Sequence, residues 1–313
     1  MKRRSLMLIE PKTVIWVEES LPALKTDEIH VRTIAGAISI GTELPIYQGI
    51  HRGSSPVVYP KMTGYESYAE VVACGANVQH MRVGQRIIAF YGHRTYAVLP
   101  AAKAIPVPRD VSPAVALLAI LGCDTAKGVS KLPIDKDDPI LIAGAGTIGL
   151  LTLFNLIQQG FMNVDVVEPL ASRQKLARQL GARLTMHPNE IEAKREPYAA
   201  GIECSSQNQA FALLQKNMKH GGQICVLADG NLEPLILLPE FHEKELSIVG
   251  SSDGEDYFGY AEWFWDVAKA AAHDLEQLYQ LKIPCSELVE TFGQLADAGP
   301  NPIKVFVDYL TEG

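Results

Sequence analysis

The clearest pattern of hydrophobic positions lies in the middle of the chain. An apolar run at 140–143 predicts a buried strand, and a glycine-rich turn follows it. Apolar residues then recur at helical spacing as far as Gln159, where Gly160 ends the pattern. A second apolar run at 164–167 ends in the acid Glu168. The pattern therefore predicts a strand–helix–strand unit with two parallel strands.

The glycines of this turn are typical of a dinucleotide-binding site. Gly144 permits the tight turn, Gly146 lets a pyrophosphate approach the backbone, and Gly149 lets helix and strand pack closely. The helix that begins at Thr147 and Ile148 offers N–H groups and a positive dipole end to phosphates. The alternative is a glycine-rich turn with a structural role only.

The acid after the second strand bears on the choice of cofactor. Glu168 can accept hydrogen bonds from the adenosine ribose and would repel a 2′-phosphate, which favours NAD(H) over NADP(H). Arg173 lies five residues later and weakens this preference, because an arginine there can accommodate the phosphate. A solvated helix charge is the alternative role of Arg173.

The first third of the chain has the pattern of antiparallel β-structure. Residues 29–34 alternate between apolar and polar side chains, which indicates a half-buried strand. A loop is expected at 51–60. The runs with β-like character are 5–10, 13–19, 28–38, 62–72, 86–90, 96–100 and 104–108.

Helical and strand patterns alternate in the rest of the chain. Helices are expected at 112–121, 124–132, 172–180, 207–219 and 257–267, with strands at 200–204 and, after a turn at 221–222, at 223–227. Such alternation indicates a parallel sheet, and ligands bind at the carboxyl ends of its strands. We therefore expect Cys204, Ser205, Ala228 and Ser251 to line a cofactor groove. The aromatic helix at 257–267 fits core packing, a substrate wall or a dimer face.

Composition narrows the class of protein. The length of 313 residues suits two domains, and a net charge of −8 argues against a nucleic-acid partner. No apolar run is long enough for a membrane span, and the N-terminal apolar stretch is too short for a signal peptide. Five scattered cysteines suit reduced thiols in a cytoplasm.

The order of elements resembles the medium-chain dehydrogenase/reductase superfamily. The motifs that carry the resemblance are GTE at 41–43, GYE at 64–66, VGQR at 83–86 and AGAGTIG at 143–149. The resemblance implies an α/β protein with a GroES-like β-barrel catalytic domain at 1–123. It also implies a doubly wound Rossmann domain with a parallel sheet at 124–268 and a return to the catalytic domain at 269–313.

The chain departs from the zinc-dependent members of this superfamily. The positions of their zinc ligands are occupied by Ile40, Tyr65 and either Ile120 or Leu121, and one thiol at Cys123 cannot hold zinc alone. We therefore expect no zinc. The GTE and GYES motifs are similar to bacteriochlorophyllide a dehydrogenases, zinc-free members that oxidise the hydroxyethyl side chain of a chlorin.

Without zinc, protein groups must stabilise the substrate oxygen. The resemblance places Thr42 at the hydroxyl that contacts this oxygen, and Tyr65 in the place of a metal ligand, where a phenol can donate to an oxyanion. Glu43 and Glu66 are carboxylates that could tune proton release, or hold barrel turns together. His93 is the candidate acid or base, with a surface-loop role as the alternative.

The resemblance also places Thr125 beside the nicotinamide, although an ordinary helix hydroxyl is an equal alternative. These expectations describe an NAD(H)-dependent, zinc-independent oxidoreductase that acts on a secondary alcohol or ketone of a small molecule. Two rivals stay open, an ene or quinone reductase that uses NADPH and a non-catalytic nucleotide-binding redox sensor. Apolar runs at 235–238 and 246–249 could form a homodimer.

Overall fold

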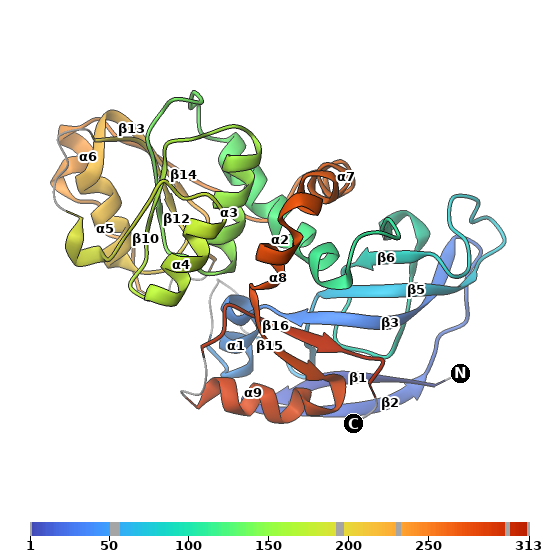
Figure 1. The fold of residues 1–313 in the computed structure, drawn as a ribbon. Coiled ribbons are helices and arrows are strands. Elements are labelled where there is room, and N and C mark those ends of the chain that lie inside the picture. The colour runs from blue at the N-terminus through green and yellow to red at the C-terminus, as the bar shows by residue number, and fades with distance from the viewer. Residues whose placement is uncertain (1, 51–56, 192–196, 230–232, 298–300, 312–313) are drawn as a thin grey trace. The chain divides into compact units, whose positions relative to one another are not determined.

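The computed structural model describes residues 2–50, 57–191, 197–229, 233–297 and 301–311, so the expected loop at 51–60 lies mostly outside the described residues. The chain divides into two compact units (Figure 1). One unit comprises Met1–Leu117 and Leu278–Gly313, and the other comprises Leu118–Gln277. The domain borders given by the resemblance stay a prediction, because compact units need not coincide with folding domains.

The unit Leu118–Gln277 contains a parallel sheet, as the alternating pattern predicts. The strand order is β11-β10-β9-β12-β13-β14, the doubly wound order of dinucleotide-binding folds. Every pairing in this sheet is parallel. The strands are β9 (Ile140–Ala143), β10 (Val164–Val167), β11 (Leu184–Met186), β12 (Tyr198–Glu203), β13 (Met218–Val226) and β14 (Ser247–Gly250).

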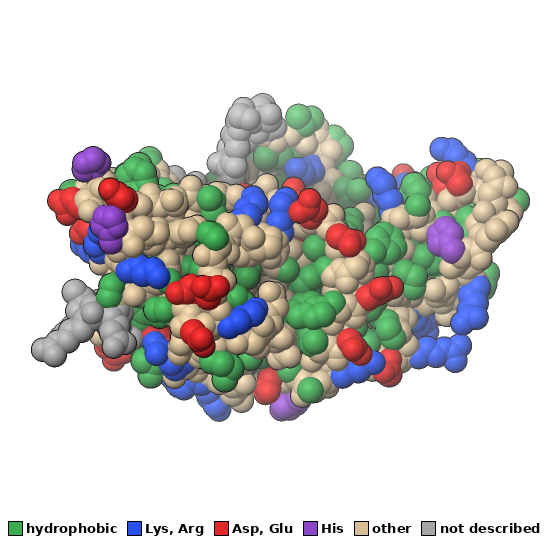
Figure 2. Space-filling view, turned by 90° about the horizontal axis from the view of Figure 1, so that it is seen from above, with side chains coloured by type: hydrophobic (Ala, Val, Ile, Leu, Met, Phe, Trp, Pro, Cys, Tyr) green, Lys and Arg blue, Asp and Glu red, His purple; other side chains and the backbone are tan. Residues whose placement is uncertain are grey.

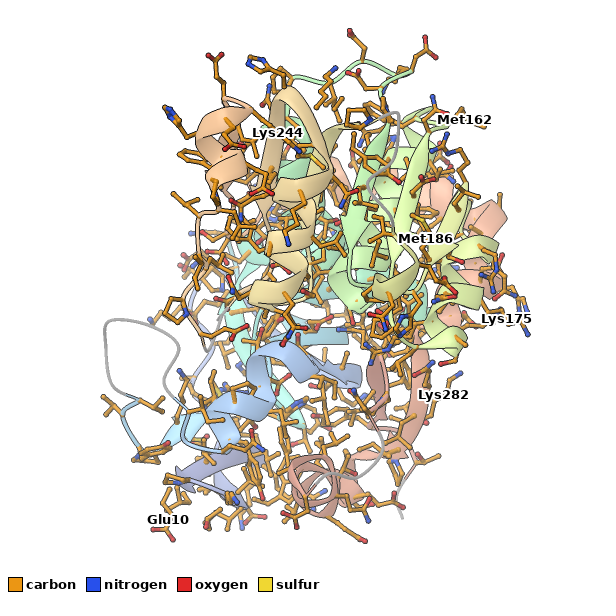
Figure 3. The ribbon with its side chains drawn as sticks, turned by 90° about the vertical axis from the view of Figure 1, so that its left-hand side faces the viewer. Glu10, Met162, Lys175, Met186, Lys244 and Lys282 are labelled. Atoms are coloured by element: carbon orange, nitrogen blue, oxygen red, sulfur yellow. The ribbon has the colours of Figure 1, made fainter. Side chains whose placement is uncertain are left out.

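Amphipathic helices cover this sheet. In α4 (Ala171–Gln179), Leu176 and Ala177 are buried, whereas Lys175 projects outward in Figure 3. In α7, Phe264 and Trp265 are buried and serve core packing, whereas Phe258 is 42% exposed. The helices of the unit are α3 (Thr147–Gln158), α4, α5 (Asn208–Asn217), α6 (Pro239–Glu243), α7 (Tyr257–Ala268) and α8 (Ala272–Glu276), with short 3₁₀ turns η2 (Pro188–Glu190) and η3 (Lys269–Ala271).

The two helices expected at 112–121 and 124–132 are one continuous helix, α2 (Pro113–Ser130). Gly122 lies inside it without breaking it. A Cβ at this position would lie 2.5 Å from the hydroxyl oxygen of Tyr260, so the glycine serves close packing instead of a turn. Among the described residues, α2 is the one helix long and apolar enough to cross a membrane, but 72% of it is buried inside the protein, as in a core helix.

The turn expected at 221–222 lies within strand β13. The strand begins at Met218, and its register against β12 jumps from Met218 to Gln223. Gly221 has a φ of +69°, a conformation that glycine adopts without strain. The glycine pair therefore forms an irregularity in the strand, and the expected strand is longer at its N-terminal end.

The other unit is built mainly from antiparallel strands, as expected for the first third of the chain, and β15 and β16 at its edge pair in parallel. A three-stranded sheet has the order β2-β1-β4, and a second sheet has the order β15-β16-β3-β5-β6-β8, with β7 paired to β3. Its strands are β1 (Lys2–Glu10), β2 (Thr13–Ser20), β3 (Glu28–Ile38), β4 (Lys61–Met62), β5 (Glu66–Cys74), β6 (Arg86–Ala89), β7 (Tyr96–Pro100), β8 (Ile105–Pro106), β15 (Tyr279–Pro284) and β16 (Lys304–Asp308).

The C-terminal segment joins this unit through strand pairing. Strand β16 runs antiparallel to β3, with Val305 opposite Ile38 and Asp308 opposite Ala35. Two 3₁₀ turns, η1 (Ala101–Lys103) and η4 (Cys285–Glu287), and the helix α9 (Leu288–Ala296) complete the unit together with α1. One core therefore contains Ile283, Phe292 and Val305 of the C-terminal segment together with Leu6 and Ile38 of the N-terminal strands.

The pattern of residues 39–49 did not predict the helix that the structure has there, α1 (Ile40–Tyr47). Pro45 lies inside it, a position at which proline weakens a helix. Tertiary packing compensates, because Pro45 and Tyr47 are buried and the Tyr47 ring lies 5.4 Å from the Phe292 ring of α9. This helix carries two of the expected catalytic residues, Thr42 and Glu43.

Acidic and basic side chains are interspersed on the face shown in Figure 2. No broad area of one sign covers the described residues of that face. This face therefore offers nucleic-acid phosphates no broad basic patch.

The glycine-rich turn allows a test of the fold. A Cβ at Gly149 would lie 1.9 Å from the carbonyl oxygen of Gly144, so the substitution Gly149→Ala requires these two backbone segments to move apart. We expect it to lower the free energy of unfolding by about 2–3 kcal/mol, measured by urea denaturation. Gly146→Ala is the matched control, because a Cβ there meets nothing within 4 Å and the φ of −77° suits any residue. Equal stability of the two variants would contradict this account.

Candidate active site and dinucleotide site

The turn after β9 has the local geometry of a phosphate-binding loop. Gly144 has a φ of +100°, and its N–H donates to the carbonyl oxygen of Val167 over 2.8 Å. Helix α3 begins at Thr147 after Gly146, and no side chain caps this end. The start of a helix attracts anionic groups, and the space above Gly146 is open. Thr147 and Ile148 are half-buried at this helix end. The arrangement can accommodate a pyrophosphate.

Glu168 is buried directly beside this loop. Its exposed fraction is 3%, its Oε2 accepts the N–H of Ala145 over 2.8 Å, and its Oε1 accepts the N–H of Leu170 over 3.0 Å. A carboxylate has about four acceptor positions, so two bonds leave capacity for ribose hydroxyls. Glu168 therefore links the glycine-rich turn to the start of α4, a role that the sequence pattern did not suggest. Arg173 is half-buried on the first turn of α4.

The other expected cofactor residues follow the carboxyl ends of neighbouring strands. Cys204 and Ser205 follow β12, and a Cβ at Gly144 would lie 3.0 Å from the Cβ of Ser205. Ala228 follows β13, and Ser251 follows β14 with its N–H bonded to Val226 over 3.1 Å. The structure thus brings these four residues to the same edge of the sheet as the glycine-rich turn. Their contact with a cofactor stays a prediction.

Thr125 has a different environment. Its side chain is fully buried, and its hydroxyl donates to the carbonyl of Gly122 over 2.8 Å and accepts from the amide of Asn155 over 2.7 Å. Tyr260 donates in turn to the amide oxygen of Asn155 over 2.7 Å. These bonds tie α2, α3 and α7 together. The hydroxyl of Thr125 thus has the structural role that the alternative assigns to it, and its place beside a nicotinamide stays a prediction.

The five expected catalytic residues all lie in the barrel unit, where two of them are accessible. Thr42 and Tyr65 are half-buried. Glu43, Glu66 and His93 have exposed fractions of 6%, 1% and 2%. Only the first two side chains therefore have surface from which a substrate could be touched.

Tyr65 is surrounded by hydroxyl groups and carboxylates. Its phenol makes hydrogen bonds with the side chains of Ser39 and Thr42. Burial and the negative charge of Glu66 raise the pKa of Tyr65 well above its ordinary value. The phenol therefore stays protonated over the physiological pH range and can act as a hydrogen-bond donor.

Glu66 is held by a partner that the sequence pattern did not single out. The ammonium group of Lys304 lies 2.6 Å from its Oε1, and both side chains are fully buried. Lys304 is the first residue of β16, and Glu66 is the first residue of β5, so the two strands flanking β3 carry the pair. A lysine between apolar residues in a strand is the one signal that could have suggested a buried cation here.

Glu43 and His93 form a second buried pair. The Nε2 of His93 lies 3.1 Å from the Oε2 of Glu43, and its Nδ1 lies 3.2 Å from the hydroxyl oxygen of Tyr309. The other carboxylate oxygen of Glu43 accepts the backbone N–H of Ser39 over 2.9 Å. Sequence reasoning found Glu43 and His93 but missed Ser39 and Tyr309.

These residues do not fit a zinc ion. Ile40 has no donor atom, the Tyr65 phenol is bonded to hydroxyls, and both nearby carboxylates are held by Lys304 and His93. Ile120 and Leu121 are buried apolar residues of α2. Across the described parts of the chain, no group of three or more histidine, cysteine, aspartate or glutamate side chains is placed to hold a metal. Zinc is usually held by three or four such ligands.

Known proteins share this architecture. No protein-family model matches the sequence. An L-threonine 3-dehydrogenase of Pectobacterium carotovorum is 26% identical over 264 residues, which cover 72% of this chain and 76% of that protein. The solved structure of a predicted zinc-binding dehydrogenase from Sinorhizobium meliloti 1021, bound to NADP, matches with a TM-score of 0.85 and 19% identity over 98% of this chain and 99% of the other.

An alcohol dehydrogenase from Escherichia coli CFT073 in complex with NADH matches with a TM-score of 0.84 and 19% identity, covering 98% and 99% of the two chains. The chain has the fold of the medium-chain dehydrogenases/reductases. The sequence likeness supports the same superfamily. For a medium-chain dehydrogenase/reductase fold, the unusual feature is the barrel cluster, where Ile40 and Tyr65 stand at positions of expected zinc ligands and hydroxyl and charged side chains surround the tyrosine.

The buried pair of Glu66 and Lys304 can be tested by removing one charge or both. Lys304→Met leaves an uncompensated buried carboxylate, and we expect it to lower the free energy of unfolding by about 3–5 kcal/mol in urea titrations. The double variant Lys304→Met/Glu66→Gln removes both charges and should recover most of this loss. A double variant as unstable as the single one would refute the interpretation.

Proposed function

We propose that this protein is an NAD(H)-dependent dehydrogenase or reductase that works without zinc on a secondary alcohol or ketone. The observation that carries the proposal is the Tyr65 phenol, which is half-buried, held by Ser39 and Thr42, and kept protonated by its surroundings. A hydroxyl donor of this kind can take the place of a metal as the group that polarises a carbonyl. The superfamily fold and the glycine-rich turn supply the nucleotide half of the proposal.

The two accessible hydroxyl groups have distinct tasks in this proposal. A bound nicotinamide supplies or accepts the hydride. Tyr65 donates its hydrogen to the substrate oxygen and stabilises the negative charge that develops on it, while the Thr42 hydroxyl donates to the phenol oxygen and holds it in place. Glu43, Glu66 and His93 are too deeply buried to touch a substrate, so they hold the donors in place.

The preference for NAD(H) rests on Glu168. Its carboxylate lies at the end of β10 beside the glycine-rich turn, where it would repel a 2′-phosphate. Solved structures of this fold contain either NADP or NADH, so the fold alone does not decide. The charge of Glu168 is the feature of this chain that favours NAD(H).

The substrate is a medium-sized, partly apolar molecule in this proposal. The similarity of the GTE and GYES motifs to bacteriochlorophyllide a dehydrogenases favours the hydroxyethyl side chain of a chlorin. L-Threonine, which appears in the name of the relative from Pectobacterium carotovorum, also carries a secondary alcohol. Both belong in one substrate panel.

The test is NADH formation from NAD⁺ by metal-stripped protein with a panel of secondary alcohols, with NADP⁺ in parallel. We expect turnover with NAD⁺ that survives stripping. Tyr65→Phe should lower kcat about a hundredfold, because one donor to the oxyanion is lost. Tyr96→Phe, which removes a half-buried phenol elsewhere in the barrel unit, should leave kcat unchanged.

Other outcomes point to the rival functions. Loss of turnover on stripping, with recovery on adding zinc, would refute metal-free chemistry. Consumption of NADPH with an alkene or quinone substrate, but none with ketones, would favour the ene or quinone reductase. Tight NADH binding without turnover on the whole panel would favour the redox sensor.

We also propose that the protein is a cytoplasmic homodimer that pairs through the β14 edge of its sheet. Strand β14 is the last in the sheet order, and in the preceding segment Ile236 and Leu237 are each 54% exposed. None of the five cysteines forms a disulfide, which supports a reducing compartment.

Light scattering tests the dimer. The protein should have twice the chain mass of 34.2 kDa, and Leu237→Lys should shift it toward the monomer. Met162→Lys alters a residue that is 70% exposed on the loop after α3 and should leave the mass unchanged. A monomeric wild-type protein would refute this arrangement.

A further inference from the structure

A line of buried hydrogen bonds connects the C-terminal end of the chain to the Tyr65 site. The hydroxyl oxygen of Tyr309 lies 3.2 Å from the Nδ1 of His93, and the Nε2 of His93 lies 3.1 Å from Glu43. Glu43 then accepts the backbone N–H of Ser39, whose side chain hydrogen-bonds with Tyr65. All five residues belong to the barrel unit.

We propose that Tyr309 is a positioning residue for the proposed reaction, which acts through His93 and Glu43 to fix Ser39 and thereby the phenol of Tyr65. The proposal rests on the function proposed above. It also gives His93 a different task from the acid or base expected from the sequence, because both of its ring nitrogens are already bonded inside the protein.

The chemistry of the partners fixes the direction of the bonds. A carboxylate can only accept, so the Nε2 of His93 must carry the proton that faces Glu43. In the neutral ring, Nδ1 is then an acceptor, and the hydroxyl of Tyr309 must donate to it. Burial raises the pKa of Tyr309 well above its ordinary value, so its hydroxyl keeps the proton for this bond. Glu43 therefore selects the Nε2–H tautomer of His93, and the Tyr309 hydroxyl completes the line by donating to Nδ1.

Packing leaves the His93 ring little freedom to rearrange. A Cβ at Gly64 would lie 2.7 Å from its Cδ2, and one at Gly36 would lie 3.8 Å from its Nδ1. The ring of Phe292 meets it edge-on, with centroids 6.2 Å apart. With the ring held on these sides, its two hydrogen bonds set the orientation that remains, and the Tyr309 hydroxyl supplies one of them.

The link from Glu43 to Tyr65 runs through the start of α1. Ser39 precedes this helix, its side chain makes no capping bond, and its backbone N–H is held by the Glu43 carboxylate. Anchoring the backbone leaves the Ser39 hydroxyl directed to Tyr65. A change at Tyr309 should therefore reach Tyr65 although the two side chains do not share a hydrogen bond in this line.

The test is Tyr309→Phe, with Tyr47→Phe as its matched control. Tyr47 packs on the same Phe292 ring, with centroids 5.4 Å apart, but its hydroxyl donates to the carbonyl of Lys12 over 2.9 Å and not to His93. Both variants lose one phenol oxygen from the same core. A structural effect alone would affect both, whereas the proposed line involves Tyr309 only.

We expect Tyr309→Phe to lower kcat roughly threefold to tenfold, the size of one lost buried hydrogen bond, while KM for the nucleotide and the melting temperature stay close to wild type. Tyr47→Phe should leave kcat unchanged. Unchanged kcat in Tyr309→Phe, or an equal loss of kcat in both variants, would overturn the proposal.

Nuclear magnetic resonance supplies a readout that needs no activity. With ¹⁵N-labelled histidine, the His93 signal should report the Nε2–H tautomer in wild type and should change in Tyr309→Phe only. With tyrosine labelled at the ring carbon that bears the hydroxyl, the Tyr65 signal should move in the same variant. If no substrate is turned over, these signals still test the line, so a failure of the proposed function is distinguishable. Unmoved His93 and Tyr65 signals would refute the proposal by themselves.

Discussion

The buried ion pair between Lys304 and Glu66 is the interaction on which the barrel site depends. Both side chains are fully removed from solvent, where an unpaired charge would be very costly. The pair can form only when β16 lies beside β3 and places Lys304 opposite the start of β5. The last strand of the chain is therefore needed to neutralise a carboxylate adjacent to Tyr65 in the sequence. Because Lys304 and Tyr309 both come from this segment, the C-terminal return supports each of the two buried carboxylates near the site.

The central βαβ unit could be predicted from the sequence because its information is local. The apolar runs match β9 and β10 residue for residue, and the glycines mark the turn between β9 and α3. Helix α1 could not be predicted in this way, because Pro45 argues against a helix and the burial of Tyr47 against α9 outweighs it. The sequence pattern predicts two helices where the structure has α2. A glycine such as Gly122, which is needed for close contact with Tyr260, has the same sequence signal as the end of a helix.

For the candidate site, too, the sequence predicted the residues that lie in local motifs and not their long-range partners. The sequence indicated Thr42, Glu43, Tyr65 and Glu66 because these residues are part of the motifs at 41–43 and 64–66. Lys304, the partner of Glu66, and Tyr309, the partner of His93, each lie more than two hundred residues from the residue they bind, and no spacing rule connects them to the motifs. The sequence also did not reveal that His93 has both nitrogens bonded at 2% exposure, since burial depends on the whole core around it. Only the three-dimensional structure therefore reveals these contacts between residues that are distant in the sequence.

Replacing a metal by hydroxyl donors changes what the barrel must provide. A zinc ion stabilises a developing alkoxide by its charge and orients it through its ligands. A phenol offers one hydrogen bond, so its contribution depends on the position of its oxygen and on a site without competing water. This requirement explains why the buried side chains of Glu43, Glu66 and His93 support two accessible hydroxyl groups. In a zinc site the ligands fix the metal directly, whereas here the same precision requires a supporting layer in which Lys304 neutralises Glu66 and the hydrogen bonds have one direction.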